Sequence, residues 1–253
     1  METIVSKPNL YDLLYEDVVE DIALYLRLTV DYKTILEYGA GTGRVTIPLA
    51  NAGHHVVALD LEKAMLEKLK SKVINDKVLS DSIEVVNGDM TKYISQQKFA
   101  CIIIPLTSFN YLTTKEDQEA CIKTLSDNLN KEGIAILELL SQNTFFDIDT
   151  NDKLKFIKKI NLENGKYYEY WRNTILDMKS REITQRRLFR LFDSGNVKID
   201  EEELFWQNRF VTIDDFKNLL KGYDLEIDKI YGDCQLGEYN SDSPDVFIKI
   251  KKL

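Results

Sequence analysis

The sequence predicts an α/β fold in which a doubly wound, mostly parallel sheet carries an antiparallel β insert. Apolar strand segments alternate with amphipathic helical segments up to about residue 140, which is the pattern of a parallel sheet covered by helices. A glycine-rich turn follows the first expected strand, and an acidic residue ends the second. After Ser141 the helical period gives way to aromatic and β-branched runs separated by turn residues, which indicates an antiparallel meander.

The elements of the parallel sheet follow from the hydrophobic pattern in chain order. Apolar residues recur with a mostly helical period between residues 10 and 28, which predicts a leading helix or helix pair. Strands and helices then alternate. We expect strands over residues 34–38, 55–59, 83–86, 99–104 and 134–140, and helices over residues 43–51, 62–74 and 115–129.

The later part of the chain predicts the insert and the end of the core. Turn signals separate the expected insert strands, which cover residues 154–161, 166–177, 181–192 and 197–210. Thr212, with Asp215 three positions on, is a capping pair that predicts a helix up to residue 220. Two strands follow, over residues 225–231 and 246–250. We therefore expect a core formed by residues 1–145 and 210–253, and an insert over residues 150–210.

Residues 37–43 read Glu-Tyr-Gly-Ala-Gly-Thr-Gly, and Asp60 ends the second strand about 20 positions further on. Glycines let a bound ligand approach the backbone closely, and the carboxylate suits the two hydroxyls of a ribose. A dinucleotide fingerprint would place its third glycine at position 44, where this chain has Arg44. The pattern predicts a nucleoside site and argues against the alternative of a dinucleotide-dependent oxidoreductase.

On these residues the sequence resembles the class I S-adenosylmethionine-dependent methyltransferases, whose first motif has the form Glu-x-Gly-x-Gly-x-Gly. The agreement extends over roughly residues 10–142, because Asn87-Gly88-Asp89-Met90 follows the third strand and Pro105 follows the fourth. The resemblance implies a Rossmann-like sheet of seven strands, with the last two strands in a hairpin. It also implies that an insert between strands five and six covers the substrate, and that the cofactor is S-adenosyl-L-methionine.

The resemblance further implies cofactor contacts. Residues 39–43 would line the methionine moiety and the ribose, Asp60 would bind the ribose hydroxyls, and Asp89 would take the adenine amino group. Taken alone, Asp60 also suits a helix N-cap and Asp89 a turn. Three apolar side chains would enclose the adenine ring: Leu61, Met65 and Met90. The expected cofactor-binding residues are Tyr11, Glu37, Gly39, Ala40, Gly41, Gly43, Asp60, Leu61, Met65, Gly88, Asp89, Met90 and Pro105.

The leading segment Asn9-Leu-Tyr11-Asp12-Leu-Leu-Tyr15 resembles the opening of small-molecule methyltransferases, including amino-sugar N-methyltransferases. There the tyrosines close over the amino-acid end of the cofactor and the reacting centre, so Tyr11 and Tyr15 are the catalytic candidates. An amphipathic helix that uses tyrosine only for packing is the alternative. The segment after strand four also lacks the Asp-Pro-Pro-Tyr or Asn-Pro-Pro-Tyr form of enzymes that methylate adenine or glutamine amides, which favours a small molecule as acceptor.

An amine acceptor must lose a proton, and the candidate bases are few. The two histidines, His54 and His55, precede strand two and therefore lie at the opposite rim of the sheet. A base would then be a carboxylate, a tyrosine or water. Within the insert, alternation places Tyr170 and Arg172 on one strand face and Trp171 on the other, and Arg187, Arg190 and Arg209 are further pocket candidates. The substrate-binding candidates are Tyr15, Ser108, Asn110, Tyr170, Arg172 and Trp206.

Composition narrows the partners. The formal net charge of the 253 residues is −9, which argues against nucleic acid because neutralising phosphates requires a basic surface. The longest uncharged apolar run, residues 99–106, is too short to cross a bilayer, and no basic-then-apolar leader precedes it. Three widely spaced cysteines suit free thiols better than disulfides or a metal site. We expect a cytoplasmic monomer or homodimer without membrane or metal.

These observations together predict a methyltransferase that uses S-adenosyl-L-methionine and acts on a small molecule, with an amine nitrogen as the favoured acceptor. Two alternatives remain at this point. One is methylation of oxygen or carbon, and the other is a non-catalytic protein that binds S-adenosylmethionine.

Overall fold

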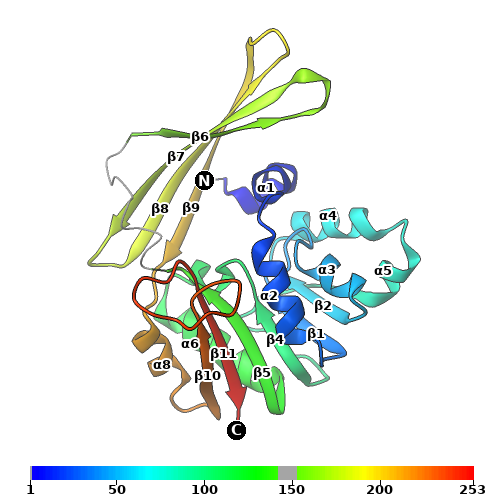
Figure 1. Cartoon of the computed structure of the whole chain (residues 1–253), viewed down its shortest axis with the longest axis vertical. Helices are drawn as coiled ribbons and strands as arrows, with labels where there is room; N and C mark the ends of the chain where they lie inside the picture. The colour runs from blue at the N-terminus through cyan, green and yellow to red at the C-terminus, as the bar shows by residue number, and fades with distance from the viewer. Residues whose placement is uncertain (1, 142–152) are drawn as a thin grey trace.

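The computed structural model describes residues 2–141 and 153–253 (Figure 1). The strands of its larger sheet are β1 (Thr34–Tyr38), β2 (His55–Asp60), β3 (Ile83–Asn87), β4 (Phe99–Ile104), β5 (Leu129–Leu139), β10 (Leu225–Tyr231) and β11 (Val246–Lys252). This seven-stranded sheet has the order β10-β11-β5-β4-β1-β2-β3. Strands β1 to β5 run parallel, whereas β11 pairs antiparallel with both β5 and β10. The predicted doubly wound sheet with a terminal hairpin is confirmed.

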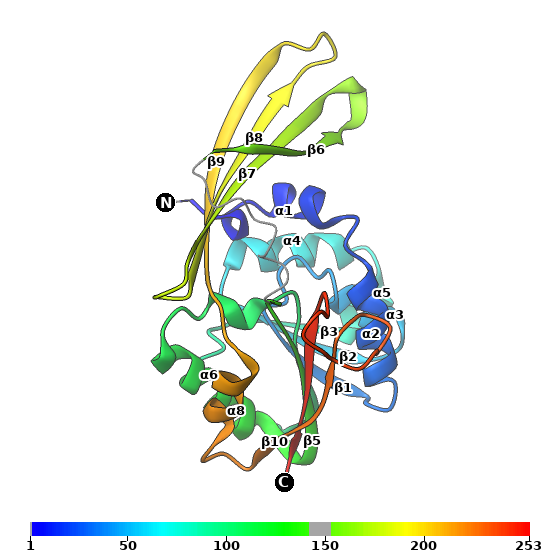
Figure 2. The same cartoon turned by 60° about the vertical axis from the view of Figure 1, so that its left-hand side comes forward.

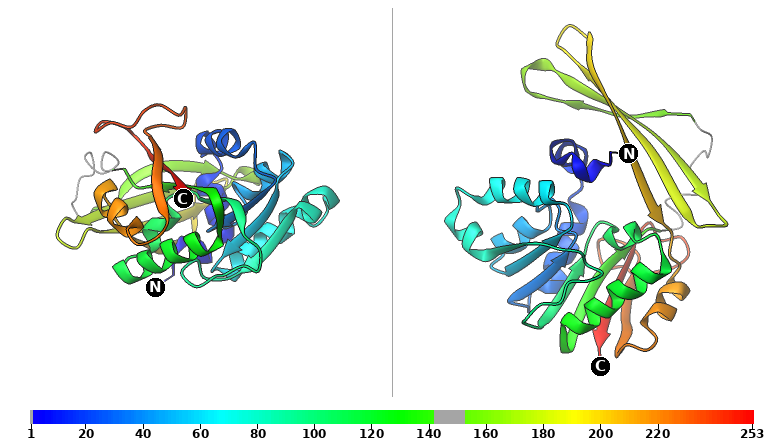
Figure 3. Two further views of the ribbon diagram at one scale, coloured as in Figure 1. Left: turned by 90° about the horizontal axis from the view of Figure 1, so that it is seen from below. Right: turned by 180° about the vertical axis from the view of Figure 1, so that it is seen from behind.

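Helices cover both faces of this sheet (Figure 3). They are α2 (Glu20–Thr29), α3 (Thr46–Asn51), α4 (Lys63–Val73), α5 (Lys77–Ser82), α6 (Lys115–Asn128) and α8 (Ile213–Leu220), whereas α1 (Pro8–Tyr15) packs in a separate cluster with the insert. Successive strand residues point to opposite faces of the sheet and are buried under different helices. Leu36 packs with α6 and α8 on one face, and Ile35 packs with α2, α3 and α4 on the other. None of the helices in residues 2–141 or 153–253 is long and apolar enough to span a membrane.

Most predicted boundaries agree with the structure, but three elements depart from the prediction. Strand β5 begins at Leu129 instead of residue 134. Helix α3 begins at Thr46 instead of residue 43, because Gly43 adopts a left-handed backbone conformation with φ of +88°. Helix α5 was not predicted. Its start is marked by Asp76, whose side chain accepts hydrogen bonds from the N–H groups of Val78 and Leu79, a capping signal that the hydrophobic pattern alone does not show.

Gly43 also lies where the glycine turn packs against α4. A Cβ atom at this position would lie 2.4 Å from Leu69 Cδ1, and Ile47 is close on the other side. We expect Gly43→Ala to lower the free energy of unfolding by about 2 to 4 kcal/mol, through overpacking and a strained left-handed alanine. Urea denaturation measures this loss. Gly53→Ala is the matched control, because Gly53 has φ of +95° with no atom within 4 Å of the added Cβ, and equal losses in both variants would contradict the packing argument.

The insert forms a second, antiparallel sheet with the order β6-β7-β8-β9. Its strands are β6 (Lys155–Asn161), β7 (Tyr167–Asp177), β8 (Glu182–Phe192) and β9 (Lys198–Arg209), each within about a residue of its predicted ends. The sheet rises above the carboxyl ends of the parallel strands (Figure 2). The expected boundary between core and insert, near residues 145–150, lies outside the described residues.

The N-terminal segment packs against the insert sheet and the core together. Ile4, Leu10 and Leu14 form one buried cluster with the inner face of the insert, including Phe189 and Leu204. Thr3 pairs with Phe205 of β9 as an isolated parallel bridge, and the Phe205 N–H donates to the Glu2 carbonyl (2.9 Å). Helix α1 also contacts α4, so it lies between the two sheets (Figure 2).

Candidate active site

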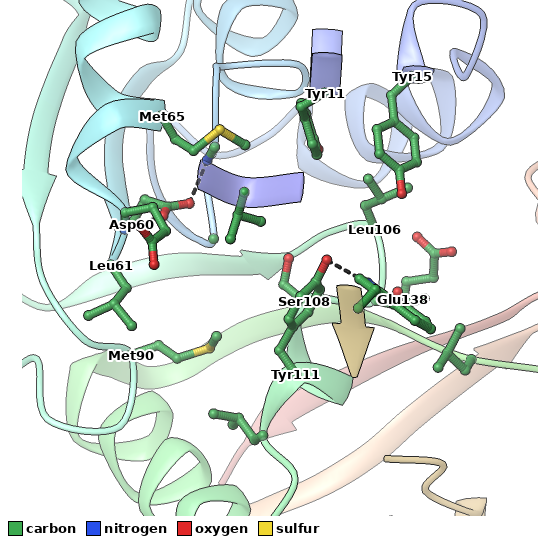
Figure 4. A pocket seen from close by; sticks show the side chains of 18 of the residues that line it. Tyr11, Tyr15, Asp60, Leu61, Met65, Met90, Leu106, Ser108, Tyr111 and Glu138 are labelled. Atoms are coloured by element: carbon green, nitrogen blue, oxygen red, sulfur yellow. Dashed lines mark hydrogen bonds between the residues drawn. The ribbon is translucent and has the colours of Figure 1, made fainter. Parts of the chain in front are cut away.

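A pocket of about 550 Å³ lies between the two sheets (Figure 4). It is lined by the carboxyl ends of β1, β2, β4 and β5, by α1, and by the inner face of β7, β8 and β9. Ligands of open α/β sheets bind at this edge, and the volume is in the range of small-molecule sites, about 300 to 1,000 Å³.

Most of the residues that the sequence singled out line this pocket. These are Tyr11, Tyr15, Gly39, Gly41, Asp60, Leu61, Met65, Gly88, Asp89, Met90, Ser108, Arg172 and Trp206. The other predicted residues do not line it: Glu37, Ala40, Gly43, Pro105, Asn110 and Tyr170. Polar lining residues that were not predicted include Glu138, Gln185 and Asp245.

Two of the predicted residues that do not line the pocket, Glu37 and Asn110, form hydrogen bonds that hold neighbouring elements together. Glu37 is buried, and its carboxylate accepts a hydrogen bond from Thr46 Oγ1 (2.6 Å) at the start of α3. Burial raises the pKa of Glu37 to about 8. Asn110 is fully buried and donates to the Arg209 carbonyl (2.8 Å), while its oxygen accepts from the Leu140 N–H (3.1 Å). Its amide thus ties β9 to the end of β5 and is not turned toward a ligand.

Tyr170 also has a structural position. It is buried in the cluster that joins the insert to α1, and its ring stacks on Phe189 with centroids 4.9 Å apart. Trp171 lies on the opposite strand face, where it packs against Phe156 and under Arg190. The predicted alternation is correct, although only Arg172 of the inward-facing pair reaches the pocket.

Asp60 fixes the glycine turn to the end of β2. Its Oδ2 accepts a hydrogen bond from the Gly41 N–H (2.7 Å), and its Oδ1 accepts from the Glu62 N–H (2.8 Å) at the start of α4. Burial raises the pKa of Asp60, although these backbone donors oppose the shift. Gly39 begins the turn in a left-handed conformation with φ of +73°. It packs so closely on Ser108 that an added Cβ would lie 2.7 Å from Ser108 Oγ.

Asp89 combines a turn role with a place in the lining. Its Oδ1 accepts from the N–H (2.8 Å) and the hydroxyl (2.7 Å) of Thr91, and its Oδ2 pairs with the exposed Lys92. Burial alone would raise the pKa of Asp89, but the Thr91 and Lys92 donors lower it below its ordinary value. Asp89 is therefore an anion at neutral pH. The apolar lining beside it comes from Leu61, Met65 and Met90 (Figure 4).

Helix α1 places Tyr11 and Tyr15 one turn apart above the glycine turn (Figure 4). Their ring centroids are 4.7 Å apart, and both line the pocket. Burial raises the pKa of Tyr11 well above its ordinary value. The Tyr11 hydroxyl thus remains protonated at neutral pH, which makes it a hydrogen-bond donor and a poor base. Tyr15 accepts a hydrogen bond from Arg187 Nη1 (3.1 Å).

Glu138, at the end of β5, is the most unusual group in the pocket (Figure 4). Its Oε2 is enclosed and has no hydrogen-bond partner within the part of the chain that the structure describes. Burial and the Asp21 carboxylate raise the pKa of Glu138 to about 8, against the lowering effect of Arg44. Arg44 itself forms a two-bond ion pair with Asp21 (2.7 and 2.5 Å). A carboxyl group with this pKa both accepts and releases protons near neutral pH.

The turn after β4 adds a strained segment to the same pocket. Leu106 and Thr107 both adopt left-handed backbone conformations, with φ of 47° and 55°, and both line the pocket. Such conformations cost about 1 to 3 kcal/mol each in residues other than glycine, and they concentrate at functional sites.

His54 immediately precedes β2 and does not line the pocket. Its Nδ1 lies 2.6 Å from the Tyr32 carbonyl oxygen.

Comparison with protein families and curated sequences agrees with this geometry. Residues 35–133 match a family model described as "Methyltransferase domain". The putative methyltransferase YqeM of Bacillus subtilis (strain 168) is 24% identical over 86% of this chain and 83% of its own length. Several further curated methyltransferases match over between 42% and 58% of their own length.

Solved structures share the whole architecture. An S-adenosylmethionine-dependent methyltransferase from Clostridium acetobutylicum ATCC 824 superposes with a TM-score of 0.78, 17% identity and 96% coverage of each chain. The amino pentose methyltransferase CalS10 from Micromonospora echinaspora superposes with a TM-score of 0.73 and 18% identity, over 96% of this chain and 97% of that one. The sequence matches, the fold and the glycine turn together indicate an S-adenosylmethionine-dependent methyltransferase, and the match to the methyltransferase family model covers residues 35–133.

Proposed function

We propose that the enzyme methylates an amine nitrogen of a small molecule. The observation that carries this proposal is Glu138, because its enclosed oxygen without a partner is suited to take a proton from a bound amine. The likeness to an amino pentose methyltransferase supports the same choice.

The residues at the core side of the pocket fit S-adenosylmethionine. Gly41 has no side chain where a Cβ would approach Met65 and the Tyr11 hydroxyl, which leaves room for a ligand above the turn. Each Asp60 oxygen accepts one backbone N–H and keeps a lone pair for a ribose hydroxyl. Leu61, Met65 and Met90 offer an apolar slot for adenine, with Asp89 at its edge. When bound, this cofactor supplies an electrophilic methyl group.

The chain's own contribution is positioning, exclusion of water and proton removal. Tyr11 and Tyr15 cover the pocket from α1, and the insert covers it from above. Enclosure of this kind orients an acceptor and strips water from its nucleophilic atom. Glu138 Oε2 would hold the proton that the amine releases. No imidazole is needed, since His54 lies at the far end of β2.

We also propose that residues 150–210 act as the substrate cover, because Arg172, Gln185, Arg187 and Trp206 line the pocket from the insert side. The net charge of −9 supports a small-molecule acceptor over nucleic acid. The free thiols of Cys101 and Cys121 support a cytoplasmic location, and the oligomeric state proposed is a monomer or a homodimer.

Turnover on matched acceptors tests the proposed function. Primary amines, alcohols and carbon acids of the same skeleton are incubated with the enzyme and S-adenosylmethionine, and mass spectrometry locates the added methyl group. Methylation at nitrogen is the expected result. Products methylated only at oxygen or carbon would overturn the choice of acceptor. Binding of S-adenosylhomocysteine with no turnover on any acceptor class would favour the non-catalytic alternative.

A further inference from the structure

Two arginines lie side by side on neighbouring strands of the insert sheet, on the face that lines the pocket. Arg172 of β7 and Arg187 of β8 are direct partners in the antiparallel register, and both line the pocket. Like charges directly opposite each other destabilise a sheet, so this arrangement needs a compensating interaction.

The compensation does not come from a carboxylate within the described ranges. Arg187 is only 3% exposed, and its hydrogen bonds go to neutral acceptors, Gln185 Oε1 (3.0 and 2.8 Å) and the Tyr15 hydroxyl (3.1 Å). The Trp206 ring lies 5.1 Å from its guanidinium carbon. These bonds use only part of the N–H donors of a guanidinium group. Among residues 2–141 and 153–253, neither Arg172 nor Arg187 forms an ion pair.

The same strand neutralises its other arginines. Arg186 pairs with Glu203 and Arg190 with Glu201, both across the β8–β9 register on the opposite face of the sheet. A buried cation without a counter-ion is costly, and Arg187 is far more buried than either of these paired arginines. Among the three arginines of β8, Arg187 alone has no carboxylate partner within the described residues, and it lines the pocket.

We propose that the methyl acceptor carries an oxyanion, a carboxylate or a phosphate, which Arg172 and Arg187 bind beneath the insert. The planar guanidinium fork matches both groups. This inference rests on the proposed function in placing the acceptor in this pocket. With Glu138 on the core side and the arginines on the insert side, the site is built for an acceptor that bears an amine and an anion at separate ends.

Binding of small anions tests the site without turnover. The chain has two tryptophans, and Trp171→Phe leaves Trp206, which packs on Arg187, as the fluorescent reporter. Protein saturated with S-adenosylhomocysteine is titrated with inorganic phosphate or with acetate at constant ionic strength, with chloride as the reference ion. We expect a saturable change with phosphate, acetate or both, and none with chloride. A response that is equal for all three salts, or absent, would overturn the site.

Variants assign the response to the arginine pair. Arg187→Gln and Arg172→Gln are each expected to weaken anion binding at least tenfold, with the affinity for S-adenosylhomocysteine unchanged. Arg172 is less buried, so its variant keeps the test valid if Arg187→Gln does not fold. Arg190→Gln is the matched control, because Arg190 lies on the outer face and pairs with Glu201. Equal weakening by the Arg190 variant would overturn the assignment.

Matched amines separate this inference from the proposed function. Ethylamine, β-alanine and 2-aminoethyl phosphate differ in lacking an anion, carrying a carboxylate or carrying a phosphate. We expect kcat/KM to be at least tenfold higher for one of the two anionic amines than for ethylamine, and the better one identifies the anion. Equal turnover of all three would overturn the oxyanion site and leave the amine function standing. Anion binding through Arg172 and Arg187, with no amine methylated, would support the site and count against the amine function.

Discussion

Replacement of Asp60 by alanine is expected to raise the dissociation constant for S-adenosylhomocysteine by about 10- to 150-fold, equivalent to about 1.5 to 3 kcal/mol. The Asp60 carboxylate is the proposed acceptor for the ribose hydroxyls. A hydrogen bond to a charged group contributes about 1.5 to 3 kcal/mol to binding. It also holds the Gly41 N–H, so the variant loosens the turn that faces the ligand. Calorimetric titration with S-adenosylhomocysteine measures the change.

Asp76 is the control that separates loss of cofactor contacts from loss of hydrogen bonds to the backbone. Asp76 likewise accepts two backbone N–H groups, those of Val78 and Leu79, but it caps α5 outside the pocket. Asp76→Ala should destabilise the chain by about 1 kcal/mol and leave the affinity for S-adenosylhomocysteine unchanged. If folded Asp60→Ala protein, checked by urea denaturation, binds S-adenosylhomocysteine as tightly as the wild type, the assigned role of Asp60 is wrong.

Replacement of Glu138 by glutamine is expected to lower kcat by about 100-fold with the best amine acceptor, which is the usual scale of a general base. The carboxyl group acts as a base only when deprotonated. Because its pKa is raised to about 8, the rate of the wild type should climb with pH and level off above about pH 8. The ratio of wild-type to variant rates should follow the same curve, which removes the contribution from titration of the amine itself.

Glu37 provides the control for Glu138, because burial raises its pKa to about 8 as well, yet it does not line the pocket. Glu37→Gln should keep kcat within about threefold, far from the loss expected of a general base. If Glu138→Gln instead weakens binding of S-adenosylhomocysteine and leaves kcat at saturation unchanged, Glu138 contacts the cofactor and not the acceptor.

Both glutamates also make stability depend on pH, with a definite sign. Their folded pKa values lie above the ordinary value of 4.5, so the folded chain keeps protons that the unfolded chain releases. Stability is therefore highest below about pH 4.5 for these two groups and falls as the pH rises to about 8. Either glutamine variant should flatten this fall, which urea denaturation at several pH values between these limits detects.

Much of the architecture was predictable because it rests on local signals. The strand over residues 99–104 is an uninterrupted apolar run between polar segments, and its observed ends, Phe99–Ile104, agree with the prediction. The capping box of Thr212 and Asp215 marks the start of α8 in the structure as it does in the sequence. The cofactor side of the pocket was predictable for a similar reason, since Asp60 and the glycine turn lie within one strand–helix–strand unit.

The catalytic and anion-binding groups depend on contacts between distant parts of the chain. Glu138 sits in an apolar strand and looks like an ordinary strand residue until burial, Asp21 and Arg44 surround it. Arg172 and Arg187 are singled out by their register opposite one another, which the turn between β7 and β8 sets, and by the carboxylates that their face lacks. Spacing along the sequence contains neither kind of information.

The pairing of Thr3 with Phe205 has a consequence for how the chain reaches this state. Insert strands joined by short hairpins form locally and early, because closing a small loop costs little chain entropy. The contact between Thr3 and Phe205 closes a loop of about 200 residues, and such non-local contacts are slow to form. Docking of the N-terminal segment should thus be a late step in folding. During synthesis, the N-terminal segment leaves the ribosome first, but it can dock only after β9 of the insert has been made, because Thr3 pairs with Phe205.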